Sequence, residues 1–463
     1  MNALSRRSLL RGALASAAVL LAACAPASAP TAAPAAKPAD VKPTEAAKPT
    51  EAAKPAAAAP ASAATSKLVF VTQSGKLSED RYNPILAKWK EKSPSVDVEV
   101  IWAGASAAEL QQKTLTLIAG GTPGDVFWTH TYTNAGLAKR KVPTNLLDFT
   151  KKDGSFKLDD FFSAAVKDFE QAGGQYAIPR ETTSTVVCFN KKIFDEAGVK
   201  YPTADWSWDD FTETAKKLTR GEGNDKIYGS AGFQQTGFSW YTLIRAWHEG
   251  GDIVNAERNK YTLNEAPGVK AVQWIQDLHH VHKAHATSVD LSAQGADVAF
   301  ASGKIGMILN ISVYSAFNNA TFDWDIQHLP KRDKQITRNA SAGHSIFSGS
   351  KQPDQAWELV KFMGSRESFE HMAATGLQIP TLKAVAEKAI DASSGKAPKS
   401  AKIGLDALGY ARPEPVTGDW IAVHRELTTA MEGILGPNKR PVKEALDGIA
   451  GKVNEAISTE PKG

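Results

Sequence analysis

The alternation of strand-like and helix-like patterns that begins at residue 67 constrains the fold most. Residues 67–73 (KLVFVTQ), 96–102 (VDVEVIW) and 125–129 (DVFWT) are rich in β-branched and aromatic residues and predict strands. The two segments between them, residues 80–92 and 107–119, have the apolar spacing of amphipathic helices. This β-α-β-α-β order predicts an α/β lobe with a largely parallel sheet.

In such a sheet, ligands collect at the carboxyl ends of the strands. The predicted strand ends are Gln73, Trp102 and the pair Trp128 and Thr129. We therefore expect these side chains to lie at a binding edge of the lobe.

A second informative stretch runs from residue 173 to residue 218. Gly173 and Gly174 predict a turn, and residues 183–189 (TSTVVCF) predict a strand. Asn190 is a suitable N-cap for a short helix that Gly198 ends. A further helix is expected over residues 208–218, so the chain passes here from one α/β unit into the next.

The chain of 463 residues is long enough for two domains. After residue 218 the pattern again predicts strands and helices in turn. The expected strands are residues 227–233, 304–310, 324–329 and 343–347, and the expected helices are 239–249, 267–283, 355–363, 420–435 and 442–457.

The first 65 residues do not read as part of a fold. Arg6 and Arg7 precede an apolar run over residues 13–23 that is too short to span a membrane, and the run ends at Cys24. We expect residues 1–23 to be a twin-arginine signal of the lipoprotein type, with acyl chains on Cys24; an ordinary signal peptide is the alternative. Residues 24–65 are rich in Ala and Pro and predict a disordered stalk.

The net charge of +4 comes from this N-terminal part, because the remaining chain holds 47 basic and 47 acidic residues. A neutral folded region gives no electrostatic reason to expect nucleic acid as a partner. Cys188 lies inside an apolar strand pattern, so we expect a buried thiol and not a nucleophile.

Five segments in order resemble those of bacterial extracellular solute-binding proteins of ABC importers, in the carbohydrate-binding class related to maltose- and trehalose-binding proteins. Gly124 replaces a usual Pro, and His344 stands where an aromatic residue is common. The segments are residues 119–130 (AGGTPGDVFWTH), 173–198, 300–310 (FASGKIGMILN), 343–368 and 410–420 (YARPEPVTGDW).

The resemblance implies a two-lobed periplasmic-binding-protein fold of type II, with the ligand in a cleft between lobes joined by hinge strands. Lobe one is expected over residues 67–182 and 312–350, and lobe two over 186–308 and 356–457. The function it implies is capture of a sugar or oligosaccharide by lobe closure, outside the cytoplasm, and delivery to a membrane permease. A monomer held to the bilayer through Cys24 is expected.

A sugar cleft needs flat aromatic rings for C–H faces and planar polar groups for hydroxyls. Each candidate also has an ordinary reading as a core aromatic or as part of a structural ion pair. The candidates are Gln73, Trp102, Trp128, Thr129, Arg180, Glu181, Trp240, Tyr241, Gly343, His344 and Arg412.

Three other functions stay open from the residues alone. Arg180 and Arg412 together could bind a phosphate, which suggests a phosphorylated polyol as ligand. A metal site is conceivable at the histidine run, and a glycosidase would need paired carboxylates such as Glu181 with Asp125 or Glu249. The run consists of His279, His280, His282 and His285.

The motifs G-x-S-x-G, the P-loop and H-E-x-x-H are missing from the sequence. We therefore expect a binding protein without catalytic residues, cofactor or metal.

Overall fold

The computed structural model describes residues 66–459 except 122, 234–239, 288, 292–294, 312–316, 318, 375–378 and 393–397. The expected signal peptide, Cys24 and the stalk lie outside the described residues, as does the run before Trp240. Within these described ranges, none of the helices combines the length and the apolar character that a membrane span requires.

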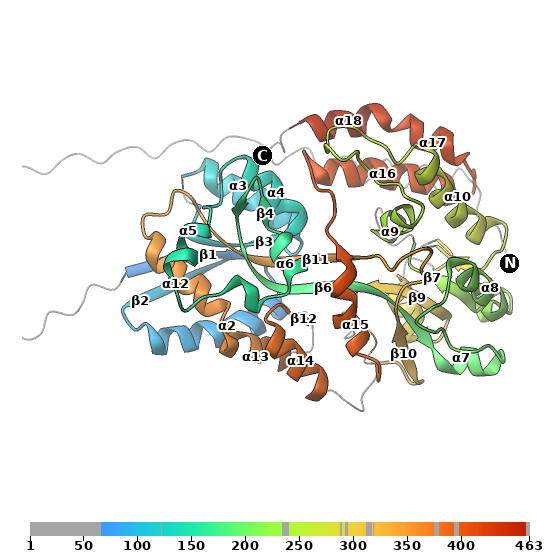
Figure 1. The fold of residues 1–463 in the computed structure, drawn as a ribbon, viewed down its shortest axis with the longest axis horizontal. Coiled ribbons are helices and arrows are strands. Elements are labelled where there is room, and N and C mark those ends of the chain that lie inside the picture. Colours follow the sequence, from blue (N-terminus) through green and yellow to red (C-terminus); the bar gives the residue numbers. More distant parts are fainter. Residues whose placement is uncertain are drawn as a thin grey trace, which may run out of the picture. The chain divides into compact units, whose positions relative to one another are not determined.

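One long strand, β6 (Ile178–Asn190), connects the two halves of the structure, and all of its residues are buried. Its first half pairs antiparallel with β11 (Thr337–Ile346), while its second half pairs antiparallel with β9 (Ile305–Ile311) and β10 (Trp324–Gln327). The strand therefore belongs to the sheets of both lobes, as Figure 1 shows.

The lobe-one sheet confirms the predicted parallel arrangement. Strand β1 (Ser66–Thr72) pairs in parallel with β2 (Val96–Trp102) and with β3 (Val126–His130), and β3 pairs antiparallel with β11. The other elements of this half are α2 (Lys76–Lys92), α3 (Ala107–Ala119), α4 (Thr131–Lys139), α5 (Leu147–Lys152), η1 (Leu158–Asp160), α6 (Ser163–Lys167), β4 (Glu170–Gln171), β5 (Gly174–Gln175), α12 (Pro353–Met363), α13 (Arg366–Ala374), β12 (Ile379–Pro380) and α14 (Lys383–Ala392).

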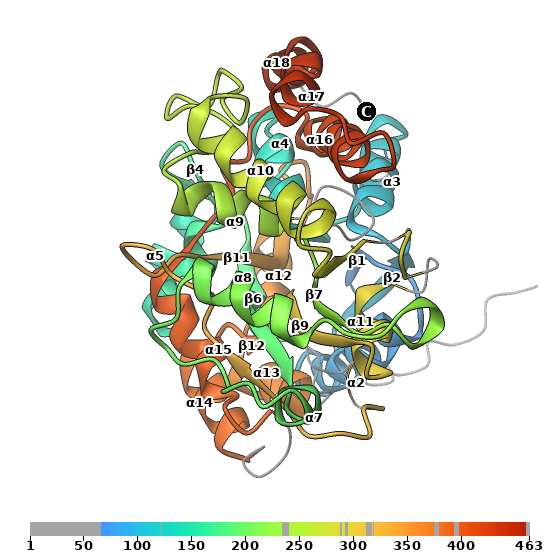
Figure 2. The same cartoon turned by 90° about the vertical axis from the view of Figure 1, so that its right-hand side faces the viewer.

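The lobe-two sheet is mixed. Strand β7 (Tyr228–Ala231) pairs in parallel with β8 (His285–Ala286) and with β9, and helices surround this sheet (Figure 2). The helices are α7 (Lys191–Glu196), α8 (Trp208–Leu218), η2 (Gly223–Asp225), α9 (Trp240–His248), α10 (Ala266–His280), α11 (Ala296–Ala301), α16 (Trp420–Leu435), α17 (Val442–Gly448) and α18 (Ala450–Ser458).

Local capping signals set two helix starts, of which the one at Asn190 was predicted from the sequence. Asn190 accepts a hydrogen bond from the backbone N–H of Ile193 at the start of α7. A capping box in which Ser207 and Asp210 bond each other's backbone N–H starts α8. The expected helix over residues 442–457 is divided into α17 and α18, with Ile449 between them.

Two large apolar cores lie on the two sides of β6. One contains Leu68, Phe70 and Trp89 of lobe one, and the other contains Trp206, Trp208 and the apolar face of α16. A third, smaller core lies between Val186 of β6 and Phe300 of α11. Trp206 and Trp208 are therefore structural residues of lobe two.

Two segments pack with a different core from the one we expected. Trp357 on α12 and Phe369 on α13 pack in the lobe-one core, although we expected both in lobe two. Phe317 and Trp324 pack with the lobe-two elements, because β10 pairs with the second half of β6. An amphipathic pattern predicts that a face is buried, but it does not identify the sheet that covers it.

The expected lobe bounds imply crossings between residues 308 and 312 and between residues 350 and 356, but the chain passes between the lobes through other segments. Strand β11 carries the chain from lobe two to lobe one, since it pairs with β3 through Ile346. The chain returns through α15 (Lys402–Asp406), η4 (Ala407–Tyr410) and β13 (Ala411–Arg412), which pairs with the start of β11.

Gly343 marks the closest approach of strands in this region. It pairs with Thr129 of β3 and with Pro179 of β6. A Cβ at position 343 would lie 2.5 Å from the carbonyl oxygen of Ile178 and 3.2 Å from the ring of Phe169. Only glycine lets β11 lie between its two neighbours without displacing their backbone.

We predict that Gly343→Ala lowers the free energy of unfolding by about 1–3 kcal/mol through overpacking. Gly451→Ala is the matched control, because a Cβ there meets no atom within 4 Å and the residue lies in helix α18. The control should gain about 0.5–1 kcal/mol. Urea denaturation of both variants measures this, and equal effects would contradict the account of Gly343.

Candidate functional site

A β-bulge brings Arg180 and Glu181 to the same side of β6. Ala342 of β11 pairs with Glu181 and Gly343 pairs with Pro179, so Arg180 is an extra residue in the ladder. Successive residues of a regular strand point to opposite faces, and a bulge changes this direction. The bulge is why two neighbouring charged side chains contact each other here.

These two residues form the centre of a buried polar network. The Arg180 guanidinium donates to Glu181 and to the Tyr82 hydroxyl, and Arg81 Nη1 lies 3.7 Å from Glu181 Oε2. Tyr82 Oη lies 2.9 Å from His344 Nε2. The candidates Arg180, Glu181 and His344 are thus brought together, but all three are buried within lobe one.

The network keeps His344 neutral. Burial lowers the pKa of His344 well below its ordinary value, and the charges of Arg180 and Arg81 lower it further. A buried ion pair with bonded partners is costly to break, because it leaves a charge uncompensated. The contacts of Arg180 and Glu181 with Tyr82 and Arg81 join the bulge to helix α2.

The predicted strand ends gather at one edge of the lobe-one sheet. Trp102 pairs in register with Thr72, so it lies beside Gln73, and both are partly buried. Trp128 and Thr129 are buried at 5% and 1% exposure. The chain continues through His130, whose ring lies 6.1 Å from Trp128 and 4.0 Å from Tyr132.

A second cluster of aromatic and charged side chains lies in lobe two. The Arg338 guanidinium lies 4.6 Å from the centre of the Trp240 ring and donates through Nε to Glu414. Glu414 also accepts a hydrogen bond of 2.9 Å from Trp420 Nε1, and His424 Nε2 lies 3.5 Å from Glu414. Trp240 is partly buried.

The two clusters meet where α4 of lobe one contacts α16 of lobe two. Tyr132 packs against both the lobe-one core and the lobe-two core. The pKa of His130 is lowered to about 3 by burial and then by the charge of Arg338. This junction of strand end β3, helix α9 and helix α16 is the candidate ligand site.

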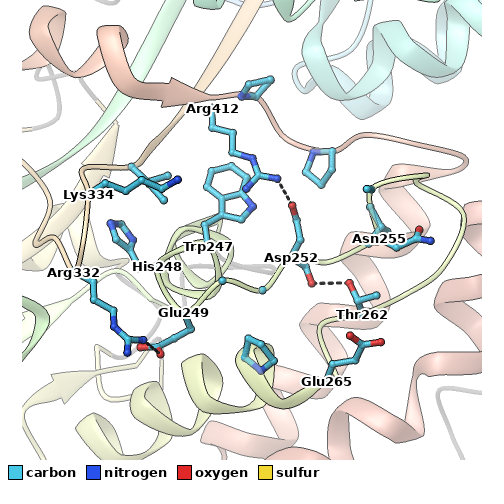
Figure 3. Close-up of a pocket in the computed structure, with 18 of the residues that line it drawn as sticks. Trp247, His248, Glu249, Asp252, Asn255, Thr262, Glu265, Arg332, Lys334 and Arg412 are labelled. Carbon is cyan, nitrogen blue, oxygen red and sulfur yellow. Dashed lines mark hydrogen bonds and ion pairs between the residues drawn. The ribbon is translucent and has the colours of Figure 1, made fainter.

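Tyr241 and Arg412 make other contacts. Tyr241 is 4% exposed and packs in the lobe-two core. Arg412 pairs with Asp252 at 2.5 Å and stacks on Trp247 at 4.6 Å. Arg412 and Asp252 line a groove of about 980 Å³ on lobe two (Figure 3). No recorded contact joins Arg412 to Arg180 within the described ranges.

The sequence did not identify five residues of the junction: His130, Tyr132, Arg338, Glu414 and His424. A signal existed for the first two, because they follow the predicted strand end directly, and for Glu414, which lies in the same segment as Arg412. Arg338 and His424 carry no local signal. Their place depends on strand pairing and helix packing.

The histidine run is dispersed into local contacts. His279 Nδ1 lies 2.9 Å from the carbonyl oxygen of His285, and His285 Nδ1 lies 3.1 Å from Ser230 Oγ. Among the residues that the structure places, no group of three or more His, Cys, Asp or Glu is arranged to hold a metal ion.

Comparison with known proteins identifies the family. Residues 75–368 match the family model described as bacterial extracellular solute-binding protein. The diacetylchitobiose binding protein DasA of Streptomyces coelicolor is 25% identical over 369 residues, which are 76% of this chain and 81% of that protein.

Two solved structures support the two-lobed fold. An ABC substrate-binding protein of Listeria monocytogenes in complex with cycloalternan has a TM-score of 0.75 at 23% identity, over 85% of this chain and all of that chain. UgpB of Mycobacterium tuberculosis in complex with glycerophosphocholine has a TM-score of 0.72 at 19% identity, over 85% and 98% of the two chains. The fold is that of type II periplasmic binding proteins, as predicted.

Three histidines with lowered pKa values predict that acid destabilises the fold. Burial lowers the pKa of His130 and of His285 to about 3, and that of His344 well below the usual value. In the unfolded chain a histidine titrates near 6.5. Below about pH 6.5 only the unfolded chain takes up these protons, so stability is full above that pH and falls toward pH 5.

The loss should be on the order of 2 kcal/mol for His130 and for His285 between pH 7 and pH 5, and His344 adds a loss in the same direction. Asp168 offsets part of it, because burial raises the pKa of its carboxyl to about 7 and folding then favours its protonated form. Urea denaturation at the two pH values tests this, with His285→Gln expected to show a smaller loss. Equal stability of the wild-type chain at both pH values would contradict the account.

Proposed function

Because the chain belongs to the family of bacterial extracellular solute-binding proteins, we propose that it is the sugar-binding subunit of an ABC importer. The observation that carries this proposal is the junction of Trp128, His130, Tyr132, Trp240 and His424, which lies between the two lobes. Aromatic rings suit the C–H faces of sugars, and imidazole and indole N–H groups suit their hydroxyls.

The charges of the junction favour an uncharged ligand. Arg338 is bonded to Glu414 at the junction, and Arg180 is bonded to Glu181 inside lobe one. The ligand therefore meets charges that are already compensated inside the protein. The names of relatives agree with a sugar, since one binds diacetylchitobiose and another was solved with cycloalternan.

A phosphorylated polyol is the second candidate, because a relative of the same fold was solved with glycerophosphocholine. That ligand class would need two arginines free to bind a phosphate together. Arg180 is 2% exposed, and Arg412 is paired with Asp252 on the groove of lobe two. The sugar is therefore the better supported ligand.

The proposed mechanism is capture by closure of the lobes about β6 and β11. A ligand that contacts both lobes only when they are closed shifts the population toward the closed form by its differential affinity. The closed form then docks on the permease, which receives the sugar. The protein itself works outside the cytoplasm, as its family does.

Attachment to the membrane is part of the proposal. The sequence before Cys24 supports export and acylation, and more than one acyl chain would give stable anchoring. The Ala- and Pro-rich residues 24–65 would then hold a monomeric binding domain away from the bilayer. Export by the twin-arginine route rests on Arg6 and Arg7.

We propose binding without catalysis. Each of the three carboxylates that we considered for a glycosidase has partners in the structure. Glu181 contacts Arg180 and Arg81, and Glu249 contacts Arg245, Lys270 and Arg332. Asp125 accepts hydrogen bonds from Val69 N and Ser350 Oγ.

A ligand panel distinguishes these functions. The purified full chain is heated with chito-oligosaccharides, α-glucans, a glycerophosphodiester or zinc, and the sugars are assayed afterwards. A higher Tm with an unconsumed sugar is the expected result. A response to the phosphodiester alone favours the second candidate, a response to zinc alone favours a metal site, and sugar turnover favours a glycosidase.

For the sugar that binds, we predict that Trp240→Ala weakens affinity by about 1.5–3 kcal/mol, because a stacked aromatic anchor is lost. Isothermal titration measures the change. Trp357→Phe is the control, since Trp357 is buried in the lobe-one core and should change stability alone. Unchanged affinity of the Trp240 variant would remove that residue from the site.

A further inference from the structure

One face of the Trp240 ring is occupied by a buried cation. The Arg338 guanidinium lies 4.6 Å from the ring centre, and Arg338 is 3% exposed. Trp240 itself is only partly buried. Arg338 covers one face of the indole and the His424 ring lies 6.3 Å from it in a T-shaped contact, so we infer that the exposed fraction belongs to the remaining surface of the ring.

Arg338 is held in place by its partners. Its Nε donates to Glu414, and Glu414 also accepts from Trp420 Nε1 at 2.9 Å. Glu414 is 4% exposed. Although burial alone would raise the pKa of Glu414, the charge of Arg338 and the bonds from His424 and Trp420 hold it at about 2. The carboxylate is thus charged wherever the protein is folded.

The position of Trp240 explains why its side chain needs Arg338 to restrict it. Trp240 is the first residue of α9 that the structure describes, and among the described residues its indole Nε1 has no hydrogen-bond partner that would restrict its rotamer. A cation stacked on the ring restricts it instead, and a binding group fixed before the ligand arrives loses less entropy on binding.

A second pair of an arginine and a tryptophan of α9 differs from the first in the exposure of its ring. Arg412 stacks on Trp247 at the same distance of 4.6 Å, but Trp247 is 4% exposed. Its ring therefore offers no free face to a ligand. Arg245 and Trp274 also combine a buried cation with a partly buried ring, but Trp274 packs against the lobe-two core, whereas Trp240 lies at the junction.

We propose that Arg338, fixed by Glu414, is a positioning residue that holds the Trp240 indole as a platform for one ring of the sugar. The inference rests on the proposed function and adds a specificity-determining element to it. Arg338 acts through Trp240 and does not itself touch the sugar. A sugar with a continuous C–H face would gain most from this platform.

The test is a double-mutant cycle on the full chain with the sugar from the panel. Arg338→Met should lower affinity roughly tenfold in the wild-type background, since the stack that positions the ring is lost. In a Trp240→Ala background the same change should leave affinity within about twofold. Isothermal titration supplies the four affinities.

Arg245→Met is the matched control. Arg245 lies on the same helix, is 5% exposed and stacks on Trp274 at 4.9 Å within the lobe-two core. This variant should lose stability and keep the wild-type affinity. If Arg338→Met does not fold, Arg338→Lys enters the cycle, because it keeps the charge but not the planar guanidinium.

Two outcomes of the double-mutant cycle would overturn the inference while the proposed function stands. Affinity that is unchanged by Arg338→Met in the presence of Trp240 would show that the stack has no role. The same tenfold loss in the Trp240→Ala background would show that Arg338 contacts the sugar directly or acts through the fold. A wild-type chain that binds no sugar of the panel would overturn the proposed function, and this inference with it.

Discussion

The pairing of β6 with two different sheets is the constraint on which the rest of the structure depends. Residues Ile178–Asn190 are buried throughout, so every polar group in the strand requires a partner inside the protein. Thr182 Oγ1 lies 3.0 Å from Ser341 Oγ, and Ser184 Oγ donates to the carbonyl oxygen of Gly404 at 2.7 Å. These bonds fix β11 and the returning segment against the hinge, and they place the candidate site beside it.

The bulge at Arg180 places two charged side chains of this strand inside lobe one, away from the candidate ligand site. Arg180 and Glu181 turn toward α2 and form a network with Tyr82 and His344 inside lobe one. The junction that faces lobe two is left to aromatic side chains and to the compensated pair Arg338 and Glu414. An uncharged sugar suits such a surface better than an anion does.

The elements of both lobes were largely predictable, because apolar periodicity and capping residues are local properties. Residues 107–119, 208–218 and 420–435 form the helices expected there, and Val96–Trp102 forms the expected strand. The crossing by β11 was not predictable, since Thr337 to Ser341 show no apolar run and are buried through long-range pairing. The packing of α12 on lobe one was missed for a similar reason.

Some residues of the candidate site could likewise be predicted from the sequence, and others could not. Trp128 and Trp240 were identified because they lie at the ends of recognisable elements. Arg338 could not be identified, because its partner Glu414 is distant in the sequence and β13 brings the two together. Arg180 and Arg412 were grouped as possible ligand contacts, whereas their ion pairs belong to different parts of the structure.

The central claim is that the two lobes close on an uncharged sugar about the hinge formed by β6 and β11. Spin labels at Leu77 on lobe one and Val298 on lobe two, both more than half exposed, report this motion in a full chain carrying Cys24→Ser. The account predicts that a saturating sugar from the panel shifts the label distances toward a single shorter population. An unchanged distance distribution with the sugar bound would contradict it.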